Sequence, residues 1–282
     1  MSVFVVPFHD IDIVGIGISF ALEQNNELSS KEQNDIFGIK KIYPTVKGGR
    51  EWFINMSDPR NDPNVTFTFN PKLIKQTDGS WNIKDNERIR INVNTPANLS
   101  EWKNVEITGY VKVDYLINTK DKGIISDIDW VARTDKHNED LPCYGLSLHG
   151  GIYPEGNVGW KKEIWFTGGY TKEKSSPPIT QPIIDRWIGW KTVIHNVNND
   201  SAVKMESYLD NSNSNHWIKV FELVDDGGWF ANSSDKVFYS ANCGRSKDHI
   251  VLNSGPIVTF RADNVALNFK NLSIREIDSG HQ

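Results

Sequence analysis

The 282-residue chain is predicted to fold as an all-β protein, an antiparallel β-sandwich of the jelly-roll type. Hydrophobic and polar residues alternate along many short segments, which clusters of Gly, Pro, Asn and Asp separate. The sequence shows no amphipathic helical period sustained over three turns and no internal repeat. Hydrophobic residues make up 38% of the chain and charged residues 24%, so a substantial core can form.

The first part of the chain differs from the rest. An apolar run over residues 11–22 is followed by polar stretches, so we interpret residues 1–36 as an N-terminal extension with a linker, and residues 37–282 as the jelly-roll domain. The run is too short to cross a bilayer, and no basic stretch precedes it as in a signal peptide. We therefore expect no membrane span. If the protein is exported, its leader is cut off or absent from this chain.

Beyond residue 37 the period is two. The longest alternating segment, residues 105–115, places Val and Ile side chains on one face and mostly charged or polar side chains on the other. Further strands are expected at residues 89–93, 128–133, 144–149, 160–166, 190–197, 203–210, 218–223, 257–261 and 267–277. Many short strands at this spacing favour a sandwich.

Composition narrows the possible partners. The net charge is −5, and Lys and Arg are scattered, so we expect no nucleic-acid partner. Ten Trp, eight Tyr and thirteen Phe exceed what a plain core needs, and such rings are platforms for flat ligands, sugars among them. Cys143 and Cys243 are either a disulfide that closes a long loop or two free thiols, and the sequence leaves both open. An extracellular or cell-surface setting is the expectation.

Three segments between residues 127 and 170 carry polar rows on their predicted strands. If these strands are neighbours, alternation places one side-chain set on a common face: Arg133, His149, Lys161, Glu163 and Trp165. Ser147 shares the face of His149, and we expect Ser147, Trp165 and Tyr144 to contact a substrate. This mixture of guanidinium, imidazole and indole groups suits a sugar, acidic or neutral.

The sharpest hypothesis is a polysaccharide lyase that acts by β-elimination on a uronate-containing glycan. Such an enzyme neutralises the uronate carboxylate, removes the adjacent proton and protonates the leaving oxygen. Arg133 is the candidate for the first task, His149 or Lys161 for the second, and Tyr170 or Tyr144 for the third. No cofactor is required for this reaction.

Two alternatives stay open. A non-catalytic carbohydrate-binding or surface module would need Trp165 and Tyr170 but not His149. A glycoside hydrolase needs two carboxylates, which Glu163 could form with Asp129 or Glu106, although no strand carries a cluster of acidic residues.

A second feature is a predicted hairpin. A Trp-led strand, which begins Trp187-Ile188-Gly189-Trp190, is followed after a short turn by residues 203–210, which end in Asp210. This hairpin resembles that of concanavalin A-like jelly rolls, in their laminin-G and polysaccharide-lyase branch, and the likeness covers roughly residues 37–277. The chain is also similar to uncharacterised proteins of ammonia-oxidising archaea, in Gly168-Gly169-Tyr170 and in Asp226-Gly227-Gly228-Trp229.

Within that branch the alginate lyases carry an Arg-bearing strand, a Gln-Ile-His triplet and a Tyr-Phe-Lys-Ala-Gly-x-Tyr stretch. Ser147-Leu148-His149 resembles the triplet at its His, and residues 165–170 resemble the stretch at Phe166, Gly168 and Tyr170. The chain departs from the pattern where Ser147 replaces Gln and Thr167 replaces Lys, and where the stretch precedes the hairpin. The resemblance implies that His149 and Tyr170 act on a uronate polymer.

The loop that follows residue 209 is rich in Asn and Ser. Asp210, Asn213 and Asn215 offer oxygen atoms at closely spaced positions, as a structural Ca²⁺ site would. The loop lacks a glycine at its sixth position and a closing Glu, and an Asn/Ser-rich hairpin turn explains it equally well.

Overall fold

The computed structural model describes residues 33–84, 87–117, 125–135, 143–165, 169–230, 243 and 245–280. The chain divides into two compact units, residues 1–41 and residues 42–282. In the described part of the first unit, the Asp35 carboxylate accepts hydrogen bonds from the N–H groups of Phe37 and Ile39, both at 2.9 Å, and so fixes a turn. The predicted N-terminal extension, residues 1–36, lies almost entirely outside the described residues.

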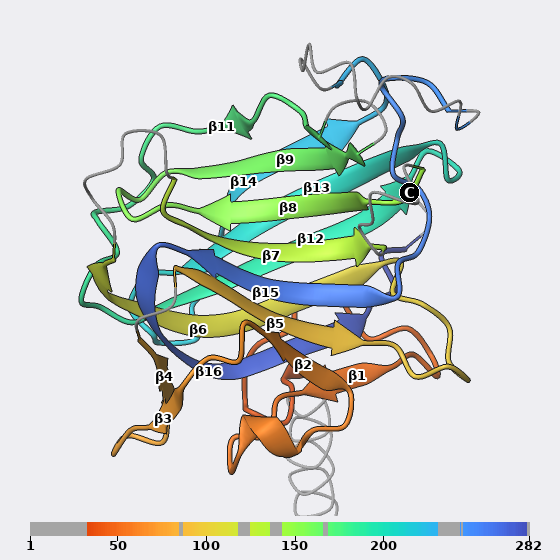
Figure 1. The fold of residues 1–282 in the computed structure, drawn as a ribbon. Coiled ribbons are helices and arrows are strands. Elements are labelled where there is room, and N and C mark those ends of the chain that lie inside the picture. The colour runs from red at the N-terminus through yellow and green to blue at the C-terminus, as the bar shows by residue number, and fades with distance from the viewer. Residues whose placement is uncertain are drawn as a thin grey trace, which may run out of the picture. The chain divides into compact units, whose positions relative to one another are not determined.

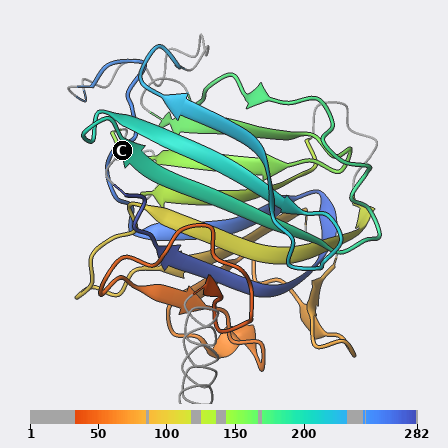
Figure 2. The same cartoon turned by 180° about the vertical axis from the view of Figure 1, so that it is seen from behind.

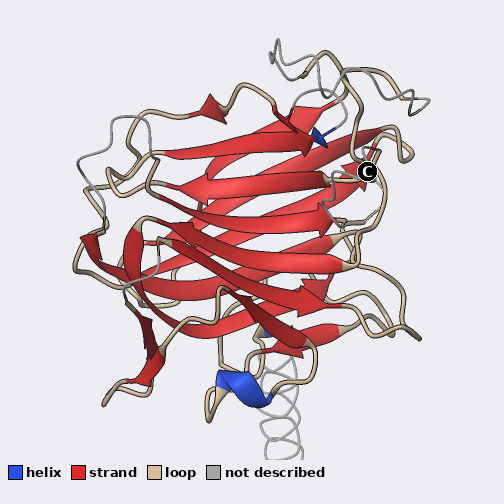
Figure 3. Ribbon diagram, viewed as in Figure 1, coloured by secondary structure: helices blue, strands red, loops and turns tan. Residues whose placement is uncertain are grey.

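The second unit is a sandwich of two antiparallel sheets of eight strands each (Figure 1). Strands dominate it (Figure 3), together with a short 3-10 helix, η1 (Pro59–Asn61). Sheet I has the order β14-β13-β12-β6-β16-β4-β3, with β1 paired to β16, and lies in front in Figure 2. Its strands are β1 (Glu51–Phe53), β3 (Leu73–Lys75), β4 (Trp81–Ile83), β6 (Val105–Leu116), β12 (Ile188–Val197), β13 (Ala202–Asp210), β14 (Ile218–Asp225) and β16 (Val265–Glu276).

Sheet II faces the viewer in Figure 1 and has the order β10-β9-β8-β7-β15-β5-β2, with β11 paired to β9. Its strands are β2 (Val65–Thr68), β5 (Arg88–Asn94), β7 (Asp127–Thr134), β8 (Leu146–Ile152), β9 (Val158–Ile164), β10 (Gly169–Tyr170), β11 (Lys174–Ser175) and β15 (Ile257–Asp263). The predicted all-β antiparallel sandwich is therefore confirmed.

Buried tryptophans join the two sheets. The indole N–H of Trp130 in β7 donates to the carbonyl oxygen of Trp190 in β12 at 2.9 Å, and the indole N–H of Trp190 donates back to the carbonyl of Gly150 in β8 at 3.2 Å. The indole N–H of Trp160 in β9 donates to Ser207 Oγ in β13 at 2.9 Å. Because a buried indole needs a partner for its N–H group, these bonds satisfy the rings and fix the sheets against each other.

The polar face of β6 is covered. Glu106, which alternation places on this face, is only 1% exposed and forms ion pairs with Lys191 and Arg275. The backbone N–H groups of Ile42 and Tyr43 also donate to its carboxylate, so the chain near residue 42 covers this face. Two cations and two N–H groups offset the removal of this carboxylate from water.

Cys143 and Cys243 form a disulfide with their Cα atoms 5.3 Å apart, which settles the alternative that the sequence left open. The bond joins positions 100 residues apart in the chain. Within the described ranges, no helix combines the length and the apolar character that crossing a bilayer requires.

Candidate functional site

A groove of about 1220 Å³ crosses the outer face of sheet II, from β9 and β10 to β2. Five residues predicted for the site line it: Ser147, His149, Lys161, Glu163 and Tyr170. The strands β7, β8 and β9 are neighbours, as the predicted patch requires. In the cross-strand register Ser147 lies opposite Glu163 and His149 lies opposite Lys161, so alternation brings all four side chains to one face.

His149 is the centre of a chain of polar contacts. Its Nδ1 lies 3.2 Å from Asp129 Oδ2, and its Nε2 lies 2.8 Å from Ser147 Oγ. The Ser147 hydroxyl also lies 3.1 Å from Glu163 Oε2, to which it can donate. With Asp129 accepting from the Nδ1 side, the imidazole is oriented with Nε2 toward Ser147, Glu163 and the groove.

Two carboxylates share one lysine on the same face. Lys161 Nζ lies 2.9 Å from Asp127 Oδ2 and 3.1 Å from Asp129 Oδ2. Burial, reinforced by the charge of Asp129, raises the pKa of Asp127 to about 6. Burial would also raise the pKa of Asp129, but Lys161 and His149 outweigh it and hold that pKa well below its ordinary value. The pair is thereby separated into a carboxylate and a group that binds a proton near neutral pH.

Tyr170 and Arg261 complete the cluster. Arg261 Nη1 donates to the Tyr170 hydroxyl oxygen at 3.1 Å, and the Tyr170 ring stands edge-on to the His149 ring with the centroids 5.4 Å apart. Tyr170 is 42% exposed, and its partial burial, reinforced by the charge of Glu163, raises its pKa, so the phenol stays protonated at neutral pH. Arg261 Nη2 donates to Asp263 Oδ2 at 2.6 Å, which fixes the guanidinium in place.

Sequence reasoning missed Arg261, although its strand was expected at residues 257–261. The available signal was the alternation itself, because Thr259, Arg261 and Asp263 are polar at every second position. What sequence could not show is that β15 pairs with β7, more than a hundred residues earlier in the chain, with Arg261 opposite Asp129.

The predicted placement of Arg133 is wrong. Its side chain is 1% exposed and turns away from the groove, with Nη1 donating to the carbonyl of Val251 at 2.6 Å and Nε donating to the carbonyl of Lys103 at 3.1 Å. Arg133 has a φ of 56°, and the pairing of β7 with β15 shifts register between Ile257 and Thr259. A left-handed residue at an irregularity reverses the alternation, so the guanidinium points to the opposite side.

Three other predicted site residues are not among the described residues that line the groove. Trp165, just after β9, and Tyr144, just before β8 and 49% exposed, are not among its lining residues. Residues 166–168, on which part of the alginate-lyase resemblance depends, lie outside the described residues. Glu106 belongs to sheet I, so it cannot pair with Glu163 for glycoside hydrolysis.

The loop considered for Ca²⁺ does not fit a metal site. Asp210 Oδ1 accepts from the N–H groups of Ser212 and Ser214, and Oδ2 accepts from the N–H of Asn215 and the hydroxyl of Tyr110. Positive φ angles at Asn213 (53°) and Asn215 (62°) match a hairpin turn. Donors therefore already surround the carboxylate, and in the described part of the chain no group of three or more acidic, His or Cys side chains is placed to bind a metal.

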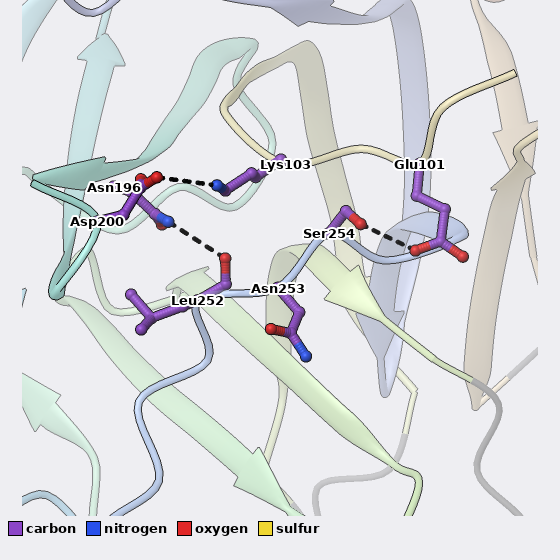
Figure 4. A pocket seen from close by; sticks show the side chains of 7 residues that line it. All are labelled: Glu101, Lys103, Asn196, Asp200, Leu252, Asn253 and Ser254. Carbon is purple, nitrogen blue, oxygen red and sulfur yellow. Dashed lines mark hydrogen bonds and ion pairs between the residues drawn. The ribbon is translucent and has the colours of Figure 1, made fainter. Parts of the chain in front are cut away.

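A smaller cavity of about 470 Å³ lies between the end of β12 and nearby loops, and its described lining residues differ from those of the groove (Figure 4). Its polar side chains contact one another: Lys103 Nζ lies 3.5 Å from Asp200 Oδ2, and the Ser254 hydroxyl donates to Glu101 at 3.0 Å (Figure 4). Among the described residues, no aromatic ring and no imidazole lines it. The groove of sheet II is thus the stronger candidate for chemistry.

No protein-family model matches the chain, and no curated protein matches it either. Among solved structures, the chain is similar to an endo-beta-1,4-glucuronan lyase from the fungus Trichoderma reesei, with 8% identity and a TM-score of 0.40 over 89% of this chain and 98% of that one. It is similar to lectin I from Ulex europaeus, with 6% identity and a TM-score of 0.39 over 81% and 98% of the two chains.

The chain is also similar to the binding domain of botulinum neurotoxin serotype D, with 13% identity and a TM-score of 0.41 over 77% of this chain. It spans 44% of that structure, less than half of its length. At these identities and TM-scores the function has to be inferred from the residues of the groove itself.

Proposed function

We propose that the groove of sheet II binds an acidic polysaccharide and cleaves it by β-elimination. The observation that carries the proposal is the convergence of three groups: Arg261 lies 3.1 Å from the Tyr170 hydroxyl, and the Tyr170 ring packs against His149. A cation, a base and a proton donor in one groove are what elimination from a uronate requires.

Each group has a separate task. Arg261, in place of Arg133, neutralises the uronate carboxylate and so acidifies the proton on the adjacent carbon. His149 removes that proton, and the electrons of the broken C–H bond form a carbon–carbon double bond as the glycosidic C–O bond breaks. Tyr170 donates its proton to the leaving oxygen, since its raised pKa keeps the phenol protonated.

A rotation of the Ser147 hydroxyl can free the Nε2 atom of His149 to act as the base. Its hydroxyl occupies His149 Nε2 at 2.8 Å but has a second acceptor in Glu163 at 3.1 Å. When the hydroxyl turns to Glu163, Nε2 is free to take the substrate proton, and the Asp129 carboxylate stabilises the imidazolium that results.

The test is direct. Native protein is incubated with alginate, polygalacturonate and glucuronan, and the ultraviolet absorbance of the unsaturated product is recorded. We expect a rise with one of these polymers, at least a hundredfold slower for His149→Gln, in line with the roughly 10²–10⁴-fold contribution of general acid–base groups. His216→Gln, an exposed imidazole outside the groove, is the matched control and should keep the native rate.

One observation favours a non-catalytic carbohydrate-binding module as the second candidate. His149 is only 3% exposed, and both of its nitrogens already have partners. On that reading the native protein and His149→Gln would bind the polymers equally and release neither unsaturated product nor reducing ends. Reducing ends without ultraviolet absorbance would indicate a hydrolase instead.

The disulfide indicates the kind of compartment in which the protein acts. Disulfides persist in oxidising compartments and are rare where thiols are kept reduced, so the Cys143–Cys243 bond supports an extracellular or cell-surface site of action. A polymeric substrate that remains outside the cell is consistent with that setting.

A further inference from the structure

We infer that the end of the groove formed by Phe69 and Arg88 is a separate subsite, which holds a carboxylate-bearing sugar unit several positions along the chain from the bond that is cut. The inference rests on the proposed function for the identity of the polymer. It adds two properties that the reacting groups do not provide: a minimum length of the bound oligosaccharide, and a residue that distinguishes charged from neutral sugars.

Phe69 is an exposed ring held in an unfavourable backbone conformation. It follows β2 with a φ of 66°, its side chain is 61% exposed, and it lines the groove. A bulky residue rarely adopts the left-handed region, and an exposed ring returns little packing for the strain. Strain of this kind concentrates at ligand sites, and a flat ring at a groove is a stacking platform for a sugar.

Arg88 is a second cation of this face, besides Arg261, that a ligand carboxylate can reach. The groove contains two other arginines, and Asp263 engages both, with Arg90 Nη2 at 3.1 Å and Arg261 Nη2 at 2.6 Å from its carboxylate. The Arg88 side chain is exposed and has no hydrogen bond or ion pair with another described side chain, while its backbone pairs with Asp263 of β15. A guanidinium in that state can bind a ligand carboxylate through two parallel hydrogen bonds.

The spacing of strands separates this subsite from the reacting groups. The order β8-β7-β15-β5 places three strand spacings between His149 and Arg88, which is about 14 Å at roughly 4.8 Å each. Phe69 lies one strand farther, at the end of β2. One sugar unit cannot reach both places, so a ligand that engages both has to be an extended oligomer lying across the strands.

The experiment measures affinity against ligand length and charge. The polymer among alginate, polygalacturonate and glucuronan that retards the native protein most in an affinity gel is fractionated from dimers to octamers, and part is carboxyl-reduced to a neutral form. Binding is measured for the native protein, Arg88→Gln, Phe69→Leu and Arg60→Gln. Arg60 is a matched control, because it is an exposed arginine paired with Asp58 outside the groove.

Arg88→Gln should bind the charged octamer roughly ten-fold or more weakly, the loss expected for a charge-assisted hydrogen-bonded pair, and should bind dimers and the neutral octamer as the native protein does. Phe69→Leu should weaken binding of both octamers, charged and neutral, and leave dimers unaffected. Arg60→Gln should match the native protein throughout.

The subsite proposal would be overturned if Arg88→Gln and Phe69→Leu bound octamers as the native protein does. It would also be overturned if both variants lost affinity equally for ligands of every length, or if none of the polymers retarded the native protein. Product formation identifies which proposal fails. If the native protein forms unsaturated product and Arg88→Gln binds octamers as the native protein does, the lyase proposal stands and the subsite proposal fails. If Arg88→Gln loses affinity only for long ligands and the native protein forms no product, the subsite proposal stands and the lyase proposal fails.

Discussion

Asp127 and Asp129 occupy one face of β7 in very different protonation environments. Both are 1% exposed, and the contacts of Asp129 with His149 and Lys161 make it the better-stabilised carboxylate. Asp127 shares the lysine but has the like charge of Asp129 beside it. The charge that orients His149 for proton transfer therefore makes its neighbour harder to ionise.

A pH dependence follows for Asp127. Its folded pKa of about 6 lies above the ordinary 3.8, so its contribution to stability is fully present below about pH 4 and is lost as the pH rises through 6. The native free energy of unfolding should thus fall between pH 4 and 7 by up to about 3 kcal/mol relative to Asp127→Asn, which cannot ionise. Urea unfolding at several pH values measures the difference, and parallel curves for the two proteins would contradict it.

At the scale of elements, alternation predicted strands well wherever a strand is long. The strand expected at residues 203–210 is β13 (Ala202–Asp210), and that expected at 218–223 is β14 (Ile218–Asp225). Six short strands were not predicted, because two to four residues carry no clear period: β1, β2, β3, β4, β10 and β11. Pairing with longer strands, such as β1 with β16 or β10 with β9, makes them strands.

The same reasoning placed most of the candidate site. Alternation predicted a common face for four residues, and the regular pairing of β8 with β9 brings them together: Ser147, His149, Lys161 and Glu163. Arg133 was misplaced because one left-handed residue reverses its direction, and a period-two reading assumes that no such residue occurs. Irregular backbone positions therefore limit how reliably alternation in the sequence predicts which side chains share a face of a strand.

Substitution of Gly255 tests how rigidly the protein holds the left-handed backbone conformation at Arg133. A Cβ atom at Gly255 would lie within 2.6 Å of backbone atoms of Arg133 and Thr134. Gly255→Ala should therefore push apart the end of β7 and the loop before β15 and lower the free energy of unfolding by roughly 1–3 kcal/mol or more. Asn253→Ala, an exposed neighbour in the same loop, should change stability by less than about 0.5 kcal/mol. Equal unfolding midpoints for the two variants would show that the loop adjusts freely.

At the scale of the molecule, one covalent link ties distant parts of the chain. The Cys143–Cys243 bond closes a loop of 100 residues that contains β8 to β14. In the chain-entropy model such a link removes about 4–5 kcal/mol of freedom from the unfolded state. Replacing both cysteines by serine should lower the free energy of unfolding by up to that amount, as chemical denaturation would show. The native protein treated with a reductant should unfold at the midpoint of the double variant, and an unchanged midpoint in both would contradict the prediction.

The hydrogen bonds that Trp130, Trp160 and Trp190 make between the layers also give the protein an internal optical probe. Water that enters between the sheets would reach all three of these indoles, so their contribution to the emission of the ten Trp would shift to the red when the two sheets separate. The outer face of β8 lines the groove, and its inner face lies toward these rings. A change in emission when an oligosaccharide is added would therefore show that ligand binding in the groove alters the packing between the sheets.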